Sequence, residues 1–207
     1  MQESEIIEIL KNRLDKKRVQ HILAVADTAE KIVRNISKES LFKKNVELNI
    51  DKNSQVKKVR LAALLHDFAK NLPPGELYSI SKLIADEWMI DDEELAIPQV
   101  LHAPVSAYLA KNEIGINDYE ILEAIRYHTI GSPEMGEIAQ VIFVSDFIEP
   151  NRDFYQARET RYELSNKGLE YSIIMICDFN IKYNIEWRRQ LHPNTVLLRN
   201  AYLRRQN

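Results

Sequence analysis

The sequence predicts an all-α protein with a single domain. Apolar residues recur mostly at intervals of three and four, and no segment shows the strict alternation of a half-buried strand. Only 5 glycines and 7 prolines interrupt the 207 residues. A chain of this length normally forms one domain with a sizeable core. We therefore expect one domain over residues 1–207, with its core over about 16–204.

The first half of the chain contains five predicted helices and one polar segment. The helix at 16–35 has an apolar stripe that includes Val19, Ile22 and Ala26. The segment 36–55 is rich in Asn, Lys, Ser, Glu and Asp, so we expect a surface insertion there. The run Asn71-Leu72-Pro73-Pro74-Gly75 ends the helix before it. The other predicted helices of this half are 3–14, 56–71, 74–85 and 91–96.

The second half is organised by caps and breakers. Pro104 suits a first helical position, which predicts a helix over 104–113 that stops near Gly115. Asn117 or Asp118 can cap the following helix, which should extend to about 129. The segment 134–148 is almost entirely apolar and should be a central helix. A long helix over 157–185, which Gly168 and Asn166 can divide, and a last helix over 193–204 complete the prediction.

Composition excludes several classes of protein. An apolar fraction of 45% and a charged fraction of 29% are typical of a globular protein. A net charge of −3 gives no overall attraction to nucleic acid or to an anionic membrane. No window approaches the roughly 20 apolar residues that a membrane span needs. Cys177 is the single cysteine, so no internal disulfide can form. We therefore expect a cytoplasmic protein with neither nucleic-acid nor membrane partners.

Polar residues interrupt four apolar segments. His66 and Asp67 lie side by side within an apolar run from Val59 to Lys70. His21, His128 and Asp146 lie in three other apolar segments. Burying an unpaired carboxylate or imidazole costs several kcal/mol. Because the residues come from separate helices, we expect them to meet one another at a metal ion.

The residue types favour phosphate chemistry at such a metal. Mixed imidazole and carboxylate donors suit iron, manganese or zinc. A bound metal of this kind activates a water near neutral pH and polarises a phosphoryl oxygen. In a continuous helix Lys70 would share a face with His66 and Asp67. Its ammonium group could then neutralise a phosphate.

The order of His21, His66-Asp67 and Asp146 resembles the H…HD…D signature of the HD superfamily of metal-dependent phosphohydrolases. Five longer motifs, in order along most of the chain, resemble the bacterial YqeK-type branch, the symmetrical diadenosine tetraphosphate hydrolases. These motifs are Leu65-His66-Asp67-Phe68-Ala69-Lys70, Leu101-His102-Ala103-Pro104-Val105, Ile125-Arg126-Tyr127-His128-Thr129-Ile130-Gly131, Asp146-Phe147-Ile148-Glu149-Pro150-Asn151-Arg152, and His192-Pro193-Asn194-Thr195 followed by Arg199-Asn200.

The resemblance implies a role for each matching residue. Iron is the implied metal, with manganese, zinc or another divalent ion as alternatives, and its ligands are His21, His66, Asp67 and Asp146. His102 and His128 would lie beside the metal, against the phosphates or around a second ion. The implied catalytic residues are Asp67, Lys70, His102 and His128. Substrate contacts are expected from Arg18, His21, Lys70, His102, His128, Asp146, Arg152, His192 and Arg199.

The reaction implied by the resemblance is hydrolysis of diadenosine tetraphosphate at its centre, by a metal-activated water, to give two ADP. The implied partner is a small-molecule nucleotide, and the protein could form a homodimer. Ala103, Ile130 and Asn151 stand where the family usually has glycine, threonine and glycine. These departures flank the expected ligands and affect the shape of the pocket, but none removes a ligand.

Three other functions remain open from the sequence. One is a different HD-type activity, a nucleotidase or a guanosine alarmone hydrolase, because the residues that would select the base are not legible. Another is a non-catalytic nucleotide or metal sensor, which the presence of every expected ligand argues against. The third is a helical adaptor with structural histidines, which would be fully stable without metal.

Overall fold

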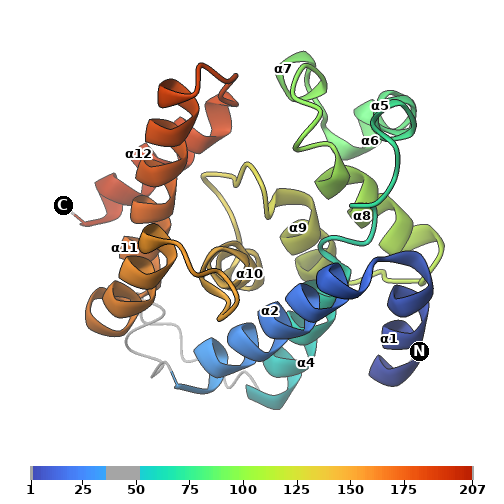
Figure 1. Cartoon of the computed structure of the whole chain (residues 1–207), viewed down its shortest axis with the longest axis horizontal. Coiled ribbons are helices and arrows are strands. Elements are labelled where there is room, and N and C mark those ends of the chain that lie inside the picture. Colours follow the sequence, from blue (N-terminus) through green and yellow to red (C-terminus); the bar gives the residue numbers. More distant parts are fainter. Residues whose placement is uncertain (1, 36–51, 207) are drawn as a thin grey trace.

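The computed structural model describes residues 2–35 and 52–206, and every regular element in these two ranges is a helix (Figure 1). The prediction of an all-α domain is confirmed. The helices are α1 (Glu3–Arg13), α2 (Lys16–Asn35), α4 (Lys52–Leu65), α5 (Pro74–Leu83), α6 (Ala85–Trp88), α7 (Asp92–Leu95), α8 (His102–Asn112), α9 (Tyr119–Tyr127), α10 (Glu137–Ile148), α11 (Tyr155–Glu186) and α12 (Pro193–Gln206).

Helix α10 occupies the middle of the molecule. It packs against α2, α4, α9 and α11, and Figure 1 shows these helices arranged around it. A helix with neighbours on several sides must be apolar around much of its circumference. This explains the almost continuous apolar sequence of α10, in which Val141, Ile142 and Val144 are buried. Asp146 is therefore exceptional, and it lies on the central helix of the fold.

Helices α2 and α4 form an extensively packed pair. Small buried residues on both, such as Ala26 of α2 and Ala62 of α4, allow the two backbones to approach closely. α4 ends at Leu65, so the predicted extension of this helix to residue 71 is wrong. The chain continues in tight turns, in which the amide of Lys70 donates to the carbonyl of Asp67 over 2.9 Å. His66 and Asp67 are thus the first residues beyond the helix.

Other boundaries differ from prediction for identifiable reasons. α8 begins at His102 and not at Pro104. The first four amide groups of a helix have no partner within the helix, so proline, which lacks an amide hydrogen, is tolerated at the third position as well as at the first. The carboxylate of Asp118 caps α9, as one of the two expected candidates. Gly168, at φ 83°, bends α11 at the expected position. Residues 52–55 of the expected insertion form the first turn of α4, and 36–51 lie outside the described residues.

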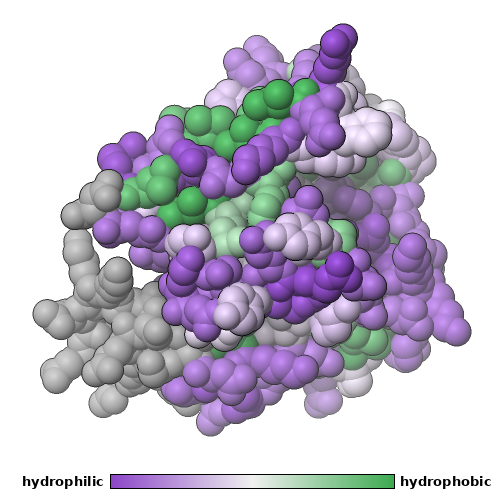
Figure 2. Space-filling model, turned by 60° about the vertical axis from the view of Figure 1, so that its left-hand side comes forward, coloured by the Kyte–Doolittle hydropathy of each residue, from purple (hydrophilic) through white to green (hydrophobic). Residues whose placement is uncertain are grey.

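One face of the molecule is largely hydrophilic (Figure 2). Figure 2 shows polar and charged side chains over most of one face, with apolar side chains gathered in its upper half. The large exposed apolar residues include Ile185 and Trp187 at the end of α11, and Leu197 on α12. Among the described residues, no helix has both the length and the apolar character needed to cross a membrane.

Gly131 is required where α9 leads towards α10. Its φ is +69°, and a Cβ there would lie 2.3 Å from Cδ2 of the buried Leu198. Gly115 has a similar φ of +82° but has open space around it. Left-handed backbone costs an L residue roughly 1–2 kcal/mol. Overpacking of a buried site costs about 1–3 kcal/mol more.

We therefore predict that Gly131→Ala lowers the free energy of unfolding by more than Gly115→Ala. Gly115→Ala is the matched control, because it carries only the backbone strain of roughly 1–2 kcal/mol. Gly131→Ala carries the same strain and also displaces Leu198. Denaturant titration of the two variants measures the difference. Equal losses would show that the contact between α12 and this turn is not tight.

Candidate metal centre

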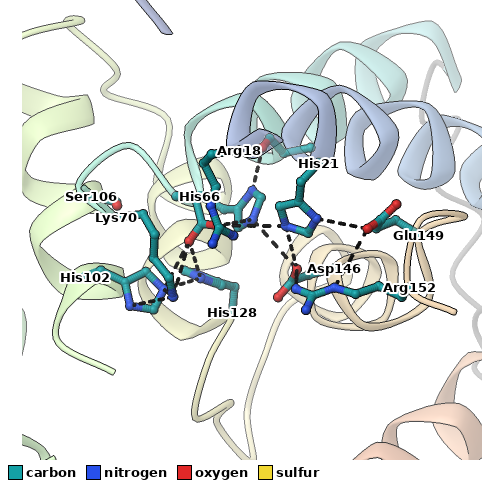
Figure 3. Close-up of polar contacts among 12 residues, drawn as sticks. Arg18, His21, His66, Lys70, His102, Ser106, His128, Asp146, Glu149 and Arg152 are labelled. Carbon is teal, nitrogen blue, oxygen red and sulfur yellow. Dashed lines mark hydrogen bonds and ion pairs between the residues drawn. The ribbon is translucent and has the colours of Figure 1, made fainter. Parts of the chain in front are cut away.

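Six polar side chains from five segments converge in the core (Figure 3). α2 and α10 contribute one residue each, the turn after α4 contributes two, the start of α8 one, and the end of α9 one. Four of the six therefore lie at helix ends, where the chain can aim a side chain inward without interrupting a helix. In chain order they are His21, His66, Asp67, His102, His128 and Asp146.

Four of these residues surround one point. Nε2 of His21 lies 3.0 Å from Oδ1 of Asp146 and 3.8 Å from Oδ2 of Asp67. Nε2 of His66 lies 3.4 Å from the same Asp67 oxygen and 3.9 Å from Oδ1 of Asp146. Two nitrogens and two oxygens thus face each other from separate elements. All four predicted metal ligands are brought together.

The buried imidazoles show that these residues fit a cation. Nε2 of both His21 and His66 is buried without a hydrogen-bond partner. Nδ1 of His66 lies 2.6 Å from the carbonyl oxygen of Ala63, which can only accept a hydrogen bond. Nδ1 is therefore the protonated nitrogen, and the Nε2 lone pair faces the carboxylates. A divalent cation among the four residues would satisfy these atoms, and the donor set suits iron, manganese or zinc.

A second pair of histidines faces the other oxygen of Asp67. Nε2 of His102 lies 3.1 Å from Oδ1 of Asp67, and Nε2 of His128 lies 3.7 Å from it. Their Nδ1 atoms lie 2.9 and 2.8 Å from the carbonyl oxygens of Gln99 and Ile125, so both Nε2 lone pairs turn inward. Asp67, His102 and His128 could hold a second ion.

Lys70 reaches this half of the cluster although the helix ends before it. Its Nζ lies 3.0 Å from Nε2 of His102 and 3.9 Å from Oδ1 of Asp67. The predicted proximity is confirmed, but a turn rather than helical spacing produces it. Burial lowers the pKa of Lys70 from its usual value, and the charges of Arg18 and Arg152 add to this effect.

The carboxylates stay ionised despite their burial. Burial alone would raise the pKa of Asp67, but the adjacent imidazoles, His66 first, hold it well below its usual range. The pKa of Asp146 is likewise far below its usual range, because His21, His66 and Arg152 outweigh burial. Burial and the neighbouring Lys70 lower the pKa of His102 to about 4. At neutral pH the cluster therefore offers charged oxygens and a neutral His102.

Two arginines close the cluster on its outer side. Nη1 of Arg18 lies 2.6 Å from Oδ2 of Asp67, and Nη2 of Arg152 lies 3.1 Å from Oδ1 of Asp146. Their side chains are 27% and 38% exposed, so both arginines reach solvent as well as the carboxylates. The structure brings both predicted residues to the site; their contact with a nucleotide stays a prediction.

A cavity of about 220 Å³ adjoins the cluster. Its polar wall includes Lys70, His102, His128 and Asp146, and two residues of α11 contribute to the opposite side. The remaining lining is largely apolar and amide. The lining residues are Lys70, Gln99, Val100, His102, His128, Thr129, Phe143, Asp146, Phe147, Ile176 and Asn180.

Two predicted substrate contacts are occupied by other side chains of the protein. His192 bridges two helix starts, with Nε2 at 3.0 Å from Oδ1 of Asp91 and Nδ1 accepting from the amide of Asn194. Arg199 pairs with Asp178. Neither lines the cavity.

His192, Asp91 and Glu94 lie close enough together to hold an ion. However, Asp91 caps α7 and Glu94 forms a buried ion pair with Arg126.

Sequence reasoning missed three supporting residues. Glu149 contacts His21, Ser106 accepts a 2.9 Å hydrogen bond from the amide of Ala69, and Arg161 contacts the chain after α10. The sequence does contain an indication of Glu149, because this residue lies three positions after Asp146 at the end of an apolar helix. No sequence pattern indicates Ser106 or Arg161, since a lone serine, or a charged residue in a polar stretch, is common in any helical protein.

Comparisons with known proteins agree with this geometry. The model of the HD domain matches residues 18–151. The chain is 32% identical over 200 residues to the symmetrical bis(5'-nucleosyl)-tetraphosphatase of Bacillus subtilis. The matched region covers 97% of each chain. The chain is 31% identical to the protein of that name from Staphylococcus aureus, over 94% of this chain and 91% of that one.

A solved structure supports the same assignment over the whole chain. The crystal structure of a predicted HD superfamily hydrolase involved in NAD metabolism, from Clostridium acetobutylicum, superimposes with a TM-score of 0.82. The two sequences are 31% identical, and the match covers 99% of this chain and 98% of that one. With its histidine and aspartate cluster in the matched region, the chain belongs to the HD-domain family, in the branch of the symmetrical bis(5'-nucleosyl)-tetraphosphatases.

Proposed function

We propose that this protein is an iron-dependent hydrolase that cleaves diadenosine tetraphosphate at its centre to give two ADP. The observation that carries the proposal is the cluster of buried His21, His66 and Asp67 with half-buried Asp146, in which unpartnered imidazole nitrogens face ionised carboxylates. The similarity to symmetrical tetraphosphatases over almost the whole chain supports the substrate and the position of cleavage.

Cleavage between the central phosphates requires that negative charge be bound from several sides. A divalent metal, when bound, supplies an activated water and stabilises charge on phosphoryl oxygens. Lys70 places an ammonium group on the cavity wall beside His102, where it can bind a non-bridging oxygen. Arg18 and Arg152 can turn from the carboxylates to the outer phosphates, because their guanidinium groups are partly exposed.

The size of the cavity limits what it encloses. Pockets that bury a drug-sized ligand are about 300–1,000 Å³, and this one is about 220 Å³. It therefore accommodates the phosphates and part of one nucleoside, whose apolar surface can pack against Phe143, Phe147 and Ile176. The second nucleoside would lie outside it.

The remaining features of the proposal are iron as the physiological metal, a cytoplasmic location and a homodimeric state. Histidine nitrogen and carboxylate oxygen suit ferrous iron but also manganese and zinc. The single cysteine, which is buried, is consistent with a reducing compartment.

The first prediction concerns the products. Anaerobically purified protein incubated with diadenosine tetraphosphate should give ADP as the sole nucleotide product, and metal analysis should find iron. A chelator should abolish turnover, and added ferrous or manganous ion should restore it. Chromatography of the products tests the cleavage position, since ATP plus AMP would mean asymmetric cleavage and contradict the proposal.

A second prediction concerns Asp67. Asp67→Ala removes a residue that contacts both histidine pairs, so bound metal should be lost. Because metal stabilisation of the transition state is worth several kcal/mol, kcat should fall by roughly 1,000-fold or more. Circular dichroism should show unchanged helix content, because Asp67 lies beyond the end of α4. Normal turnover in this variant would refute the proposed centre.

A third prediction separates phosphate binding from metal binding. Lys70→Ala should raise KM for diadenosine tetraphosphate roughly tenfold, the loss expected for one charge-assisted hydrogen bond. The metal content should stay the same, because Lys70 is not among the proposed ligands. Lys57→Ala, which removes an exposed lysine from α4, is the control and should leave KM unchanged. Loss of metal from Lys70→Ala would mean that the lysine supports the centre itself.

A further inference from the structure

A buried glutamate lies on the far side of His21 from the proposed metal. Oε1 of Glu149 is 3.1 Å from Nδ1 of His21, and the glutamate is 2% exposed. Its other oxygen, Oε2, accepts a hydrogen bond of 2.7 Å from the amide of Asn151. Figure 3 shows the His21 ring between Glu149 on one side and Asp146 on the other. Both oxygens of this carboxylate are therefore held in place.

The backbone around Glu149 is fixed from α11. Nη1 of Arg161 donates to the carbonyl oxygens of Ile148 and Glu149 over 2.7 and 3.1 Å. Nη2 of Arg161 donates to the carbonyl of Arg152 over 3.2 Å. One guanidinium group thus ties together the turn that carries both Glu149 and Arg152. Arg161 lies beyond residues 18–151, where the general HD-domain match ends.

The chemistry of the contact determines how His21 faces the centre. An ionised carboxylate only accepts hydrogen bonds, so Nδ1 of His21 must carry the proton. A ring that carries its single proton on Nδ1 has its lone pair on Nε2, which points at Oδ1 of Asp146. Two acceptors facing each other at 3.0 Å repel each other unless a metal ion or a proton lies between them. A carboxylate on the outer nitrogen of a metal-binding histidine also increases its basicity.

We propose that Glu149 and Arg161 are positioning residues for the metal: Glu149 orients His21 through Nδ1, and Arg161 holds the turn that carries Glu149. This inference rests on the proposed metal site. Arg152 is also on this turn and contacts Asp146, so the same support serves a ligand and a substrate-binding residue. The two residues act through His21 and do not touch the reacting atoms.

The test is a titration with Co²⁺ alone, followed through its visible absorption spectrum. Glu149→Gln should weaken Co²⁺ binding by roughly 10–100-fold and alter the spectrum, as loss of a partner behind a metal-binding histidine does. Asp153→Asn, which removes an acid with an 81% exposed side chain near the same turn, is the matched control. It should change the Kd by less than about twofold, since a distant surface charge is screened.

A double-mutant cycle tests whether Glu149 acts through His21. In a His21→Ala background, Glu149→Gln should have almost no further effect on Kd, because the residue it orients is gone. The full loss in that background would overturn the proposal, and so would an unchanged Kd in Glu149→Gln alone. No Co²⁺ binding by the unaltered protein would instead overturn the proposed metal site.

Arg161→Gln provides an independent variant if Glu149→Gln fails to fold, as judged by circular dichroism. It leaves Glu149 in the chain and removes only the donors to three carbonyl groups. We expect a loss of Co²⁺ affinity of about tenfold, at the lower end of such effects. An unchanged Kd in folded Arg161→Gln would overturn the role assigned to this residue and to the turn.

Discussion

The structure depends on keeping two carboxylates, Asp67 and Asp146, ionised inside an apolar core. Burial opposes their charge, yet imidazoles around both carboxylates, together with Arg152 beside Asp146, hold the two pKa values below the usual range. An isolated buried carboxylate would become protonated instead. These neighbours only partly replace a metal, because Nε2 of His21 and His66 remains unpartnered. The core thus offers a site that suits a cation.

This constraint explains where the helices stop. α4 ends at Leu65, immediately before the His66-Asp67 pair, and α9 ends immediately before His128. α8 begins with His102. A side chain at a helix end can leave the apolar face of its helix, while the helix still packs through its remaining residues. Of the six residues, only His21 and Asp146 project from within helices. Their helices, α2 and α10, pack against each other.

The sequence allowed prediction of the fold class and the cluster, but not of its supports. Polar residues such as His66 and Asp146 stand out because apolar neighbours flank them. Glu149 and Arg161 do not, because polar residues near a turn are ordinary until their contacts are known. The end of α4 was also missed, since the apolar run continues through Phe68 and Ala69 in a buried turn. His192 was expected to contact the substrate, but it contacts Asp91, which is distant in the sequence. A local sequence pattern cannot reveal such a long-range contact.

The most direct test of the account is a crystal structure of the anaerobically purified protein, measured at the iron absorption edge. The account predicts an anomalous difference peak within about 2.0–2.3 Å of the donor atoms of His21, His66, Asp67 and Asp146. A peak beside Asp91, Glu94 and His192, the other set close enough to hold an ion, would contradict it. So would a fully active protein with no peak at the four residues.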